Sequence, residues 1–235
     1  MSQSYFRFRR FTVYHDTSSM PVGTDGVLLG AWADLTEARH VLDIGTGSGL
    51  IALMAAQRAP QALVEGIDVD ALSVSQARQN AQASPFASRV LVSQADVRTF
   101  RSANGTFDHI VSNPPFFVND VLPPSVRRMR ARNASALPAA CLWDAVNRLL
   151  SEEGRFSVVL PFSSQATFVA LGLERGLYLS RSLQVRTVMR KPPKRVLLEF
   201  ARHRAEQPTC SEMLLQSPDG SRSPEYAQLT QDFYL

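Results

Sequence analysis

The nine residues from Val41 to Gly49 constrain the fold of this chain more than any other segment. They read Val-Leu-Asp-Ile followed by Gly-Thr-Gly-Ser-Gly, and an apolar run follows from Leu50. A buried strand that enters a glycine-rich turn and then a helix is the opening unit of open α/β sheets. The segment therefore predicts a sheet with a ligand at the carboxyl end of this strand.

The spacing of the glycines separates two classes of ligand. Dinucleotide-binding turns read Gly-x-Gly-x-x-Gly and hold a pyrophosphate at the helix N-terminus, whereas Gly45, Gly47 and Gly49 alternate. An alternating turn favours a ligand without phosphate, whose carboxylate meets the helix amides. Asp43, at the strand end, can then receive an ammonium group directly or through a water. A tight turn that serves backbone geometry alone is the alternative.

Acidic residues follow two more expected strands. The strand 62–70 brings Asp68 to the carboxyl edge about twenty residues after the glycines, where an acid can bind both ribose hydroxyls. Asp70 is expected to cap a helix over 71–83. The strand 90–97 ends with Asp96 and Val97, and Asp96 can accept hydrogens from an adenine amino group. For Asp68 and Asp96 the alternative is a capping or solvent-exposed carboxylate.

A second motif, Asn113-Pro114-Pro115-Phe116, directly follows the apolar run 109–112. The Asn113 side-chain oxygen and the Pro114 carbonyl can accept both hydrogens of a planar amino group, and Phe116 can stack on the ring that carries it. The prolines fix the backbone, so little ordering entropy is lost at the reactive step. These groups suit methyl transfer to an amino nitrogen, whose lone pair must be drawn out of conjugation. A proline turn with Phe116 in the core is the alternative.

Together, these motifs resemble the class I S-adenosylmethionine-dependent methyltransferases that act on amino groups. The resemblance implies S-adenosylmethionine as the cofactor, with Asn113, Pro114 and Phe116 catalytic. The expected cofactor-binding residues are Thr24, Asp25, Asp43, Gly45, Gly47, Gly49, Asp68, Asp96, Val97 and Asn113.

Three further segments narrow the resemblance. Residues Val22 to Trp32, Lys194 to Phe200 and Leu229 to Leu235 are similar to bacterial enzymes that methylate adenine N6 in valine tRNA. This resemblance covers almost the whole chain and implies that the substrate is the adenine 3′ of the anticodon. Phe116 stands where many of these relatives carry tyrosine, which keeps the stacking face but removes a hydroxyl.

Thr24 and Asp25 precede an apolar stretch that runs from Val27 to Trp32. Either side chain can cap a helix there. By resemblance, this segment lies over the methionine end of the cofactor. A capped helix that touches no ligand is the alternative.

Basic residues are unevenly placed along the chain. The net charge of +4 permits an acidic partner without requiring one. Arginines and aromatics interleave from Arg7 to Phe11, and this pattern suits contacts with phosphates and stacked bases. There are two other clusters of basic residues. One follows the Asn-Pro-Pro-Phe motif, and the other occupies an expected hairpin tip. The RNA-binding residues expected in them are Arg128, Arg130, Arg132, Lys191, Lys194 and Arg195. Solvent-exposed charged connections are the alternative.

The length and apolar content predict one domain. The chain has 235 residues, of which 45% are hydrophobic, enough to bury a sizeable core. We expect an N-terminal extension over the cofactor site in 1–35, a catalytic core in 36–204 and a C-terminal appendage in 205–235. The expected fold is a doubly wound Rossmann-like α/β sheet with helices on both faces and an antiparallel edge strand. The hairpin 178–188 and 195–200 supplies that edge, and the appendage contributes a short strand at 213–215.

Other classes of site find little support. No apolar run is long enough to span a bilayer and no secretory segment opens the chain, so a cytoplasmic protein is expected. Cys141 and Cys210 are expected to be reduced thiols, and the four histidines show no metal-ligand spacing, so no metal is expected. We expect a monomer with tRNA as its partner and no membrane association.

Three other functions fit parts of the sequence. A protein glutamine N5-methyltransferase meets the same chemical problem at an amide nitrogen and suits the same motif, although the distributed arginines disfavour it. A nicotinamide-dependent oxidoreductase shares the sheet but requires the other glycine spacing. A noncatalytic RNA-binding module that keeps the fold would bind tRNA equally well after the change Asn113→Ala.

Overall fold

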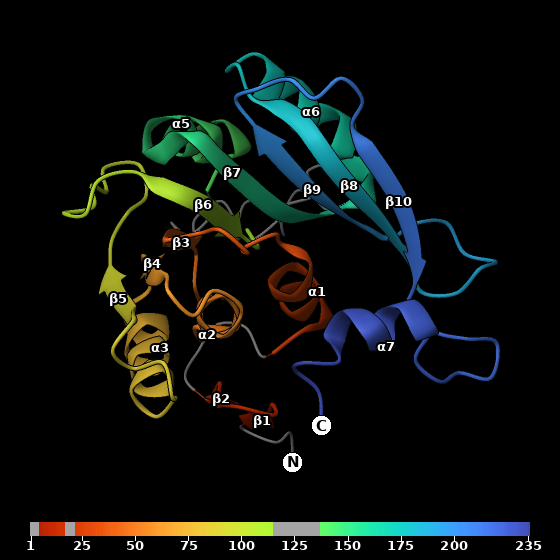
Figure 1. Cartoon of the computed structure of the whole chain (residues 1–235), viewed down its shortest axis with the longest axis horizontal. Helices are drawn as coiled ribbons and strands as arrows, with labels where there is room; N and C mark the ends of the chain where they lie inside the picture. Colours follow the sequence, from red (N-terminus) through yellow and green to blue (C-terminus); the bar gives the residue numbers. More distant parts are fainter. Residues whose placement is uncertain (1–4, 17–21, 115–136) are drawn as a thin grey trace, which may run out of the picture.

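The computed structural model describes residues 5–16, 22–114 and 137–235. Within these ranges the chain forms an eight-stranded sheet, a separate two-stranded ribbon and flanking helices (Figure 1). The elements in chain order are β1 (Tyr5–Arg7), β2 (Thr12–Tyr14), α1 (Thr24–Trp32), β3 (His40–Ile44), α2 (Leu50–Arg58), β4 (Leu63–Asp68), α3 (Ala71–Gln82), β5 (Val90–Gln94), β6 (Phe107–Ser112), α5 (Ala139–Leu149), β7 (Leu150–Pro161), η1 (Phe162–Ser164), α6 (Gln165–Leu173), β8 (Tyr178–Arg186), β9 (Arg195–Ala201), β10 (Thr209–Leu214) and α7 (Pro224–Thr230).

The large sheet has the strand order β10-β8-β9-β7-β6-β3-β4-β5. Strands β7, β6, β3, β4 and β5 pair in parallel, and β9 pairs antiparallel with both β7 and β8. The expected α/β fold and the expected hairpin are thereby confirmed. Because parallel strands end at one edge, the residues that follow β3, β4, β5 and β6 meet there.

The position of the antiparallel strand differs from the expectation. β9 lies inside the sheet, and β10 pairs parallel with β8 to form the edge instead. The sequence predicted only residues 213–215 as a strand, because the first four residues of β10 are exposed and show no apolar alternation. Backbone pairing with β8, rather than burial of side chains, therefore sets the extent of this strand.

Alternating residues of the strands face two separate cores. Val41 and Leu197 pack with α1 and α2 on one face of the sheet. Leu42 and Leu198 pack with α5 and α6 on the other face. Figure 1 shows α1, α2 and α3 on one side of the sheet and α5 and α6 on the other. Successive strand residues point to opposite faces of the sheet, so a sheet covered by helices on both faces needs apolar residues at both odd and even positions.

Helix α1 begins differently from the expectation. Gly23 occupies the N-cap position and no side chain caps the helix. Thr24 and Asp25 both lie in the first turn, so the predicted cap is wrong. The Asp25 carboxylate instead pairs with Arg195, 2.7 Å away, and an acid in the first turn also favours the positive end of the helix dipole.

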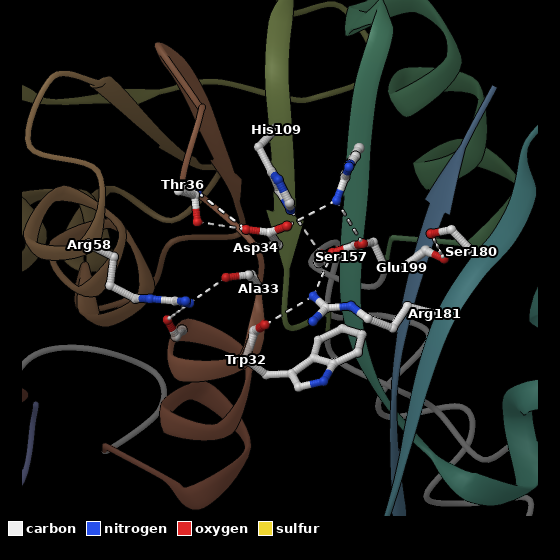
Figure 2. A network of polar contacts seen from close by, with 12 residues as sticks. Trp32, Ala33, Asp34, Thr36, Arg58, His109, Ser157, Ser180, Arg181 and Glu199 are labelled. Carbon is white, nitrogen blue, oxygen red and sulfur yellow. Dashed lines mark hydrogen bonds and ion pairs between the residues drawn. The ribbon is translucent and has the colours of Figure 1, made fainter. Parts of the chain in front are cut away.

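The carboxyl end of α1 is held by two arginines (Figure 2). Arg58 donates to the carbonyls of Gly30 and Ala33, and Arg181 donates to the Trp32 carbonyl at 3.1 Å. The Arg181 guanidinium also lies 4.0 Å from the centre of the Trp32 ring. These contacts satisfy carbonyls that have no partner within the helix, and cations at this end favour the helix dipole.

Arg181 belongs to a polar network that crosses four strands of the sheet. Its Nη2 atom lies 2.9 Å from the buried Glu199 carboxylate, which also accepts a hydrogen bond from Ser157 at 3.1 Å. Nε2 of His109 lies 2.9 Å from the Ser157 hydroxyl oxygen. Buried charges need such partners, since an unpaired one is costly. The network therefore fixes α1 against β6, β7, β8 and β9.

We expect the network to make stability depend on pH through His109. Burial lowers the pKa of this side chain from 6.5 to about 4. Between these values the unfolded chain binds a proton that the folded chain does not. The histidine should therefore cost no stability above pH 6.5, and stability should fall as the pH approaches 4, by on the order of 3 kcal/mol.

Urea unfolding of the wild type and of a His109→Gln variant, measured from pH 7 to pH 4, tests this expectation. The variant should lose less stability over the range. Equal pH dependence in both proteins would contradict a neutral buried histidine.

Candidate functional site

A cavity of about 630 Å³ opens at the carboxyl edge of the sheet. Its volume lies within the range of about 300 to 1,000 Å³ that is usual for small-molecule sites. The start of α1, the glycine-rich turn, Asn113, the end of β7 and the start of β9 meet around it. The lining residues are Gly23, Thr24, Asp25, Gly26, Leu28, Gly45, Thr46, Gly47, Ser48, Leu50, Ile51, Asn113, Pro114, Val159, Leu160, Pro161, Val185, Thr187, Lys194, Arg195 and Leu215.

The glycine-rich turn presents bare backbone to this cavity. Gly45 and Gly47 have φ angles of 72° and 55°, which favour glycine. Apart from the glycine itself and its two chain neighbours, no heavy atom of the described residues lies within 4 Å of the point that a Cβ would occupy at either position. Gly49 differs, since a Cβ there would lie 3.2 Å from the Cβ of Ala77. Gly45 and Gly47 therefore face the cavity, whereas Gly49 permits close packing of the turn on α3.

Asp43 lies beneath the turn and is fully buried. Its Oδ2 atom accepts hydrogen bonds from the Thr46 hydroxyl at 2.7 Å and from the Ala52 amide at 3.1 Å. Among the described residues, its Oδ1 atom has no hydrogen-bond partner. Burial raises the pKa of this carboxyl to about 7, although both hydrogen bonds favour the charged form. Asp43 thus ties β3 to the turn and to the first turn of α2.

Asp68 ends β4, the strand that pairs with β3. Its two carboxylate oxygens accept hydrogen bonds from the Gly47 and Asp70 amides, both at 3.0 Å. The Asp70 side chain accepts a hydrogen bond from the Ser73 amide, so its predicted capping of α3 is confirmed. Asp68 therefore orients the turn, and its side chain is half-buried.

Asp96 follows β5, the last strand at this end of the sheet. Arg98 binds both of its carboxylate oxygens, and these hydrogen bonds hold the pKa of Asp96 below its usual value. Val97 is buried in the core on the α5 side. Neither residue lines the cavity, but both lie at the same sheet edge as Asp68, because Gln94 at the end of β5 pairs with Asp68.

Asn113 and Pro114 follow β6 and also line the cavity. Ser112, the last residue of β6, pairs with Ile44 of β3, and its hydroxyl donates to the Ile44 carbonyl at 2.9 Å. The start of the Asn-Pro-Pro-Phe motif and the glycine-rich turn are therefore held together by adjacent strand ends. Pro114 is buried and Asn113 is half-buried.

Two residues expected to contact RNA line this cavity instead of standing only at a hairpin tip. Arg195, the first residue of β9, forms the ion pair with Asp25 across 170 positions of sequence. Lys194 precedes it and is exposed. Lys191 is exposed in the β8–β9 connection and does not line the cavity. Phe116, Arg128, Arg130 and Arg132 lie outside the described residues.

Sequence reasoning missed part of the cavity wall. Leu160 and Pro161 end β7 and line it, beside Asn113. A signal for them was available in the apolar run from Val158 to Leu160, because a strand that pairs in parallel with β6 must end at the same edge. Val185 and Leu215 gave no such signal, since their positions depend on how β8 and β10 pair.

Within the described ranges, no group of three or more His, Cys, Asp or Glu side chains is arranged to hold a metal ion. The helices in the same ranges include none with the length and apolar content needed to cross a membrane.

The chain is similar in sequence to a family of methyltransferases. Residues 22–160 match the family model described as methyltransferase small domain. A Phocaeicola vulgatus protein named tRNA1(Val) (adenine(37)-N6)-methyltransferase is 43% identical over all of this chain and 99% of its own length. A Cronobacter sakazakii protein with the same name is 42% identical over 98% of this chain and 94% of its own length.

The solved structures agree on the fold. A structure described as a predicted O-methyltransferase from Agrobacterium tumefaciens superimposes with a TM-score of 0.68. It covers 89% of this chain and 96% of its own, at 17% identity, so this likeness concerns the fold alone. The sequence matches go further, and the chain belongs to the family of tRNA1(Val) (adenine(37)-N6)-methyltransferases.

Proposed function

We propose that this chain transfers a methyl group from S-adenosylmethionine to N6 of an adenine in tRNA, at position 37 of a valine tRNA. One observation carries the proposal: a single cavity joins the bare backbone of Gly45 and Gly47 to Asn113 and Pro114. A cofactor site and an amino-group site must adjoin for direct transfer. The names of the relatives support the substrate, and the family resemblance supports the cofactor.

The residues at the sheet edge fit this cofactor. The open space at Gly45 and Gly47 leaves room for a ligand against the backbone. Asp68, Asp96 and Val97 follow neighbouring strands and are proposed to hold the ribose and the adenine, while Asp43 and Asp25 serve the methionine end. S-adenosylmethionine would supply an electrophilic methyl group on a sulfonium. Binding it needs no metal.

The catalytic roles follow from the chemistry of the adenine amino group. Its nitrogen is a poor nucleophile because the lone pair is delocalised into the ring. We propose that the Asn113 side-chain oxygen and the Pro114 carbonyl accept its two hydrogens and favour a pyramidal nitrogen. The nitrogen loses one of these protons after it has gained the methyl group, so a strong base is unnecessary. Phe116 is proposed to stack on the flipped base.

The oligomeric state, the location and the RNA contacts of the chain complete the proposal. We propose that a single copy of the chain acts on tRNA in the cytoplasm, with 1–35 covering the cofactor, 36–204 as the catalytic core and 205–235 as an appendage. Arg128, Arg130, Arg132, Lys191 and Lys194 are proposed to contact RNA. Arg195 is proposed to act in the cavity, because Asp25 holds its guanidinium there.

Replacing Asn113 should separate chemistry from binding. We expect Asn113→Ala to lower the turnover rate about 100-fold, since misplaced reacting groups lose that much, while tRNA affinity stays near that of the wild type. Labelled S-adenosylmethionine and unmodified valine tRNA give the rate, and mass spectrometry identifies the nucleoside. Asn147→Ala, at an exposed asparagine of α5, is the matched control. Wild-type turnover by Asn113→Ala would remove the proposed catalytic role.

Replacing the two basic residues should distinguish the cavity from the RNA surface. Arg195→Gln breaks the pair with Asp25, and we expect it to weaken cofactor binding up to about fivefold, the most that a half-exposed ion pair usually contributes. Lys191→Ala should leave cofactor affinity unchanged and weaken tRNA binding. Calorimetry with the cofactor and anisotropy with labelled tRNA provide the two affinities. Unchanged cofactor affinity and weaker tRNA binding in Arg195→Gln would contradict a role in the cavity and support a contact of Arg195 with RNA.

A further inference from the structure

The N-terminal ribbon, residues 5–14, presents one face to solvent. Its two strands pair antiparallel with Tyr5 opposite Tyr14 and Arg7 opposite Thr12. Directly opposed residues share a face of a ribbon, so these four side chains point the same way. Tyr5 and Tyr14 are each 44% exposed, and their ring centres lie 5.8 Å apart. Phe6 and Val13 form the opposite face, which packs on the core.

The tip of the ribbon carries arginines. Phe8 and Phe11 are buried, which turns Arg9 and Arg10 outward. Within the described residues, no carboxylate forms an ion pair with Arg7, Arg9 or Arg10, in contrast to the paired Arg155, Arg181 and Arg195. A hollow of about 490 Å³ adjoins the tip, and Arg9, Arg10 and Arg58 line it with Gln57 and Asp232. The Arg9 side chain donates to the Tyr234 carbonyl and the Arg10 guanidinium lies over the Phe86 ring, but neither contact neutralises the positive charge. Positive charge that no carboxylate neutralises suits an external anion.

The tyrosine end of the ribbon is joined to the cavity wall. Asn80 of α3 is fully buried and grips the Tyr14 backbone at both its amide and its carbonyl, at 3.0 and 2.8 Å. The same side chain donates to the carbonyl of Ser48, which lines the cavity, at 2.8 Å. The arginine end is fixed as well, because the Arg9 amide donates to the Phe233 carbonyl at 2.8 Å. A fixed surface thus runs from beside the cavity to the arginine tip.

We propose that this tyrosine and arginine face binds the RNA that flanks the target adenine. Exposed aromatic rings stack on unpaired bases, and unpaired arginines contact phosphates. This inference rests on the proposed function for its ligand, and it adds a binding surface to the catalytic cavity. Bases beside the target adenine would stack on Tyr5 and Tyr14, and the backbone would continue toward Arg7, Arg9 and Arg10.

Anisotropy with fluorescent, unmodified valine tRNA tests this surface. Tyr5→Ala/Tyr14→Ala should lower tRNA affinity at least about fivefold, as expected for one lost stacked base, and Tyr5→Phe/Tyr14→Phe should retain the affinity. Arg7→Ala and Arg10→Ala should each reduce the slope of log affinity against log salt by about 0.7, as expected for one phosphate contact on a single strand. Cofactor affinity and melting temperature should stay at the wild-type values, which excludes a general loss of structure.

Arg204→Ala is the charge-matched control. This exposed arginine lies in the connection between β9 and β10, which Figure 1 shows on the opposite side of the molecule from the ribbon. Its salt slope should equal that of the wild type. Ribbon variants that bind tRNA with wild-type affinity and salt slope would overturn the inference, as would a wild-type protein that does not bind tRNA.

The same proteins, assayed for methyl transfer, separate this inference from the proposed function. Wild-type protein that binds tRNA without methylating it would overturn the proposed function, and weaker binding by the ribbon variants would still support the RNA surface. Wild-type methylation with unaffected ribbon variants would overturn the surface alone.

Discussion

The buried Asp43 carboxylate is the contact on which the arrangement of the site depends. It accepts one hydrogen bond from a hydroxyl in the glycine-rich turn and one from an amide in the first turn of α2. One side chain thereby joins a strand end, a loop and a helix. Asp68 on the next strand holds the turn from the other side through the Gly47 amide. With the turn fixed at both flanks, Gly45 and Gly47 can keep left-handed backbone conformations and leave the cavity open above them. Because these hydrogen bonds already hold the turn, less ordering entropy must be overcome when a ligand binds.

The part of the cavity wall that α1 forms depends on contacts between segments far apart in the sequence. Helix α1 has Asp25 paired with Arg195 at its start and its last carbonyls bound by Arg58 and Arg181 at its end. Arg181 is in turn paired with the buried Glu199, which makes the end of α1 part of the sheet's interior network. A helix anchored at both ends has little freedom to shift, so the distance between its first turn and the glycine-rich turn is set by the fold.

A tRNA is much larger than the cavity, so its binding also needs contacts on the protein surface outside the cavity. An adenine must leave its stack to enter the site, and the cost of unstacking must be offset by contacts with neighbouring nucleotides. Two groups of side chains are candidates for such contacts. The basic and aromatic residues of the ribbon precede the core strands in the sequence, and the exposed lysines of the β8–β9 connection follow them. Binding energy from contacts at such places can hold the target base where Asn113 and Pro114 are proposed to act.

The sequence by itself determined the repeating strand, turn and helix, the alternating glycines, the acids after β4 and β5 and the Asn-Pro-Pro-Phe motif, because each is a local pattern read over a few residues. Asp70 was correctly predicted as a cap for the same reason. Only the tertiary structure decided that β10 forms the edge, that Asp25 pairs with Arg195 and caps nothing, that Gly49 packs on Ala77, and that Asn80 joins the ribbon to the cavity wall. These facts depend on which segments pair across long separations, and local propensity does not encode such pairing.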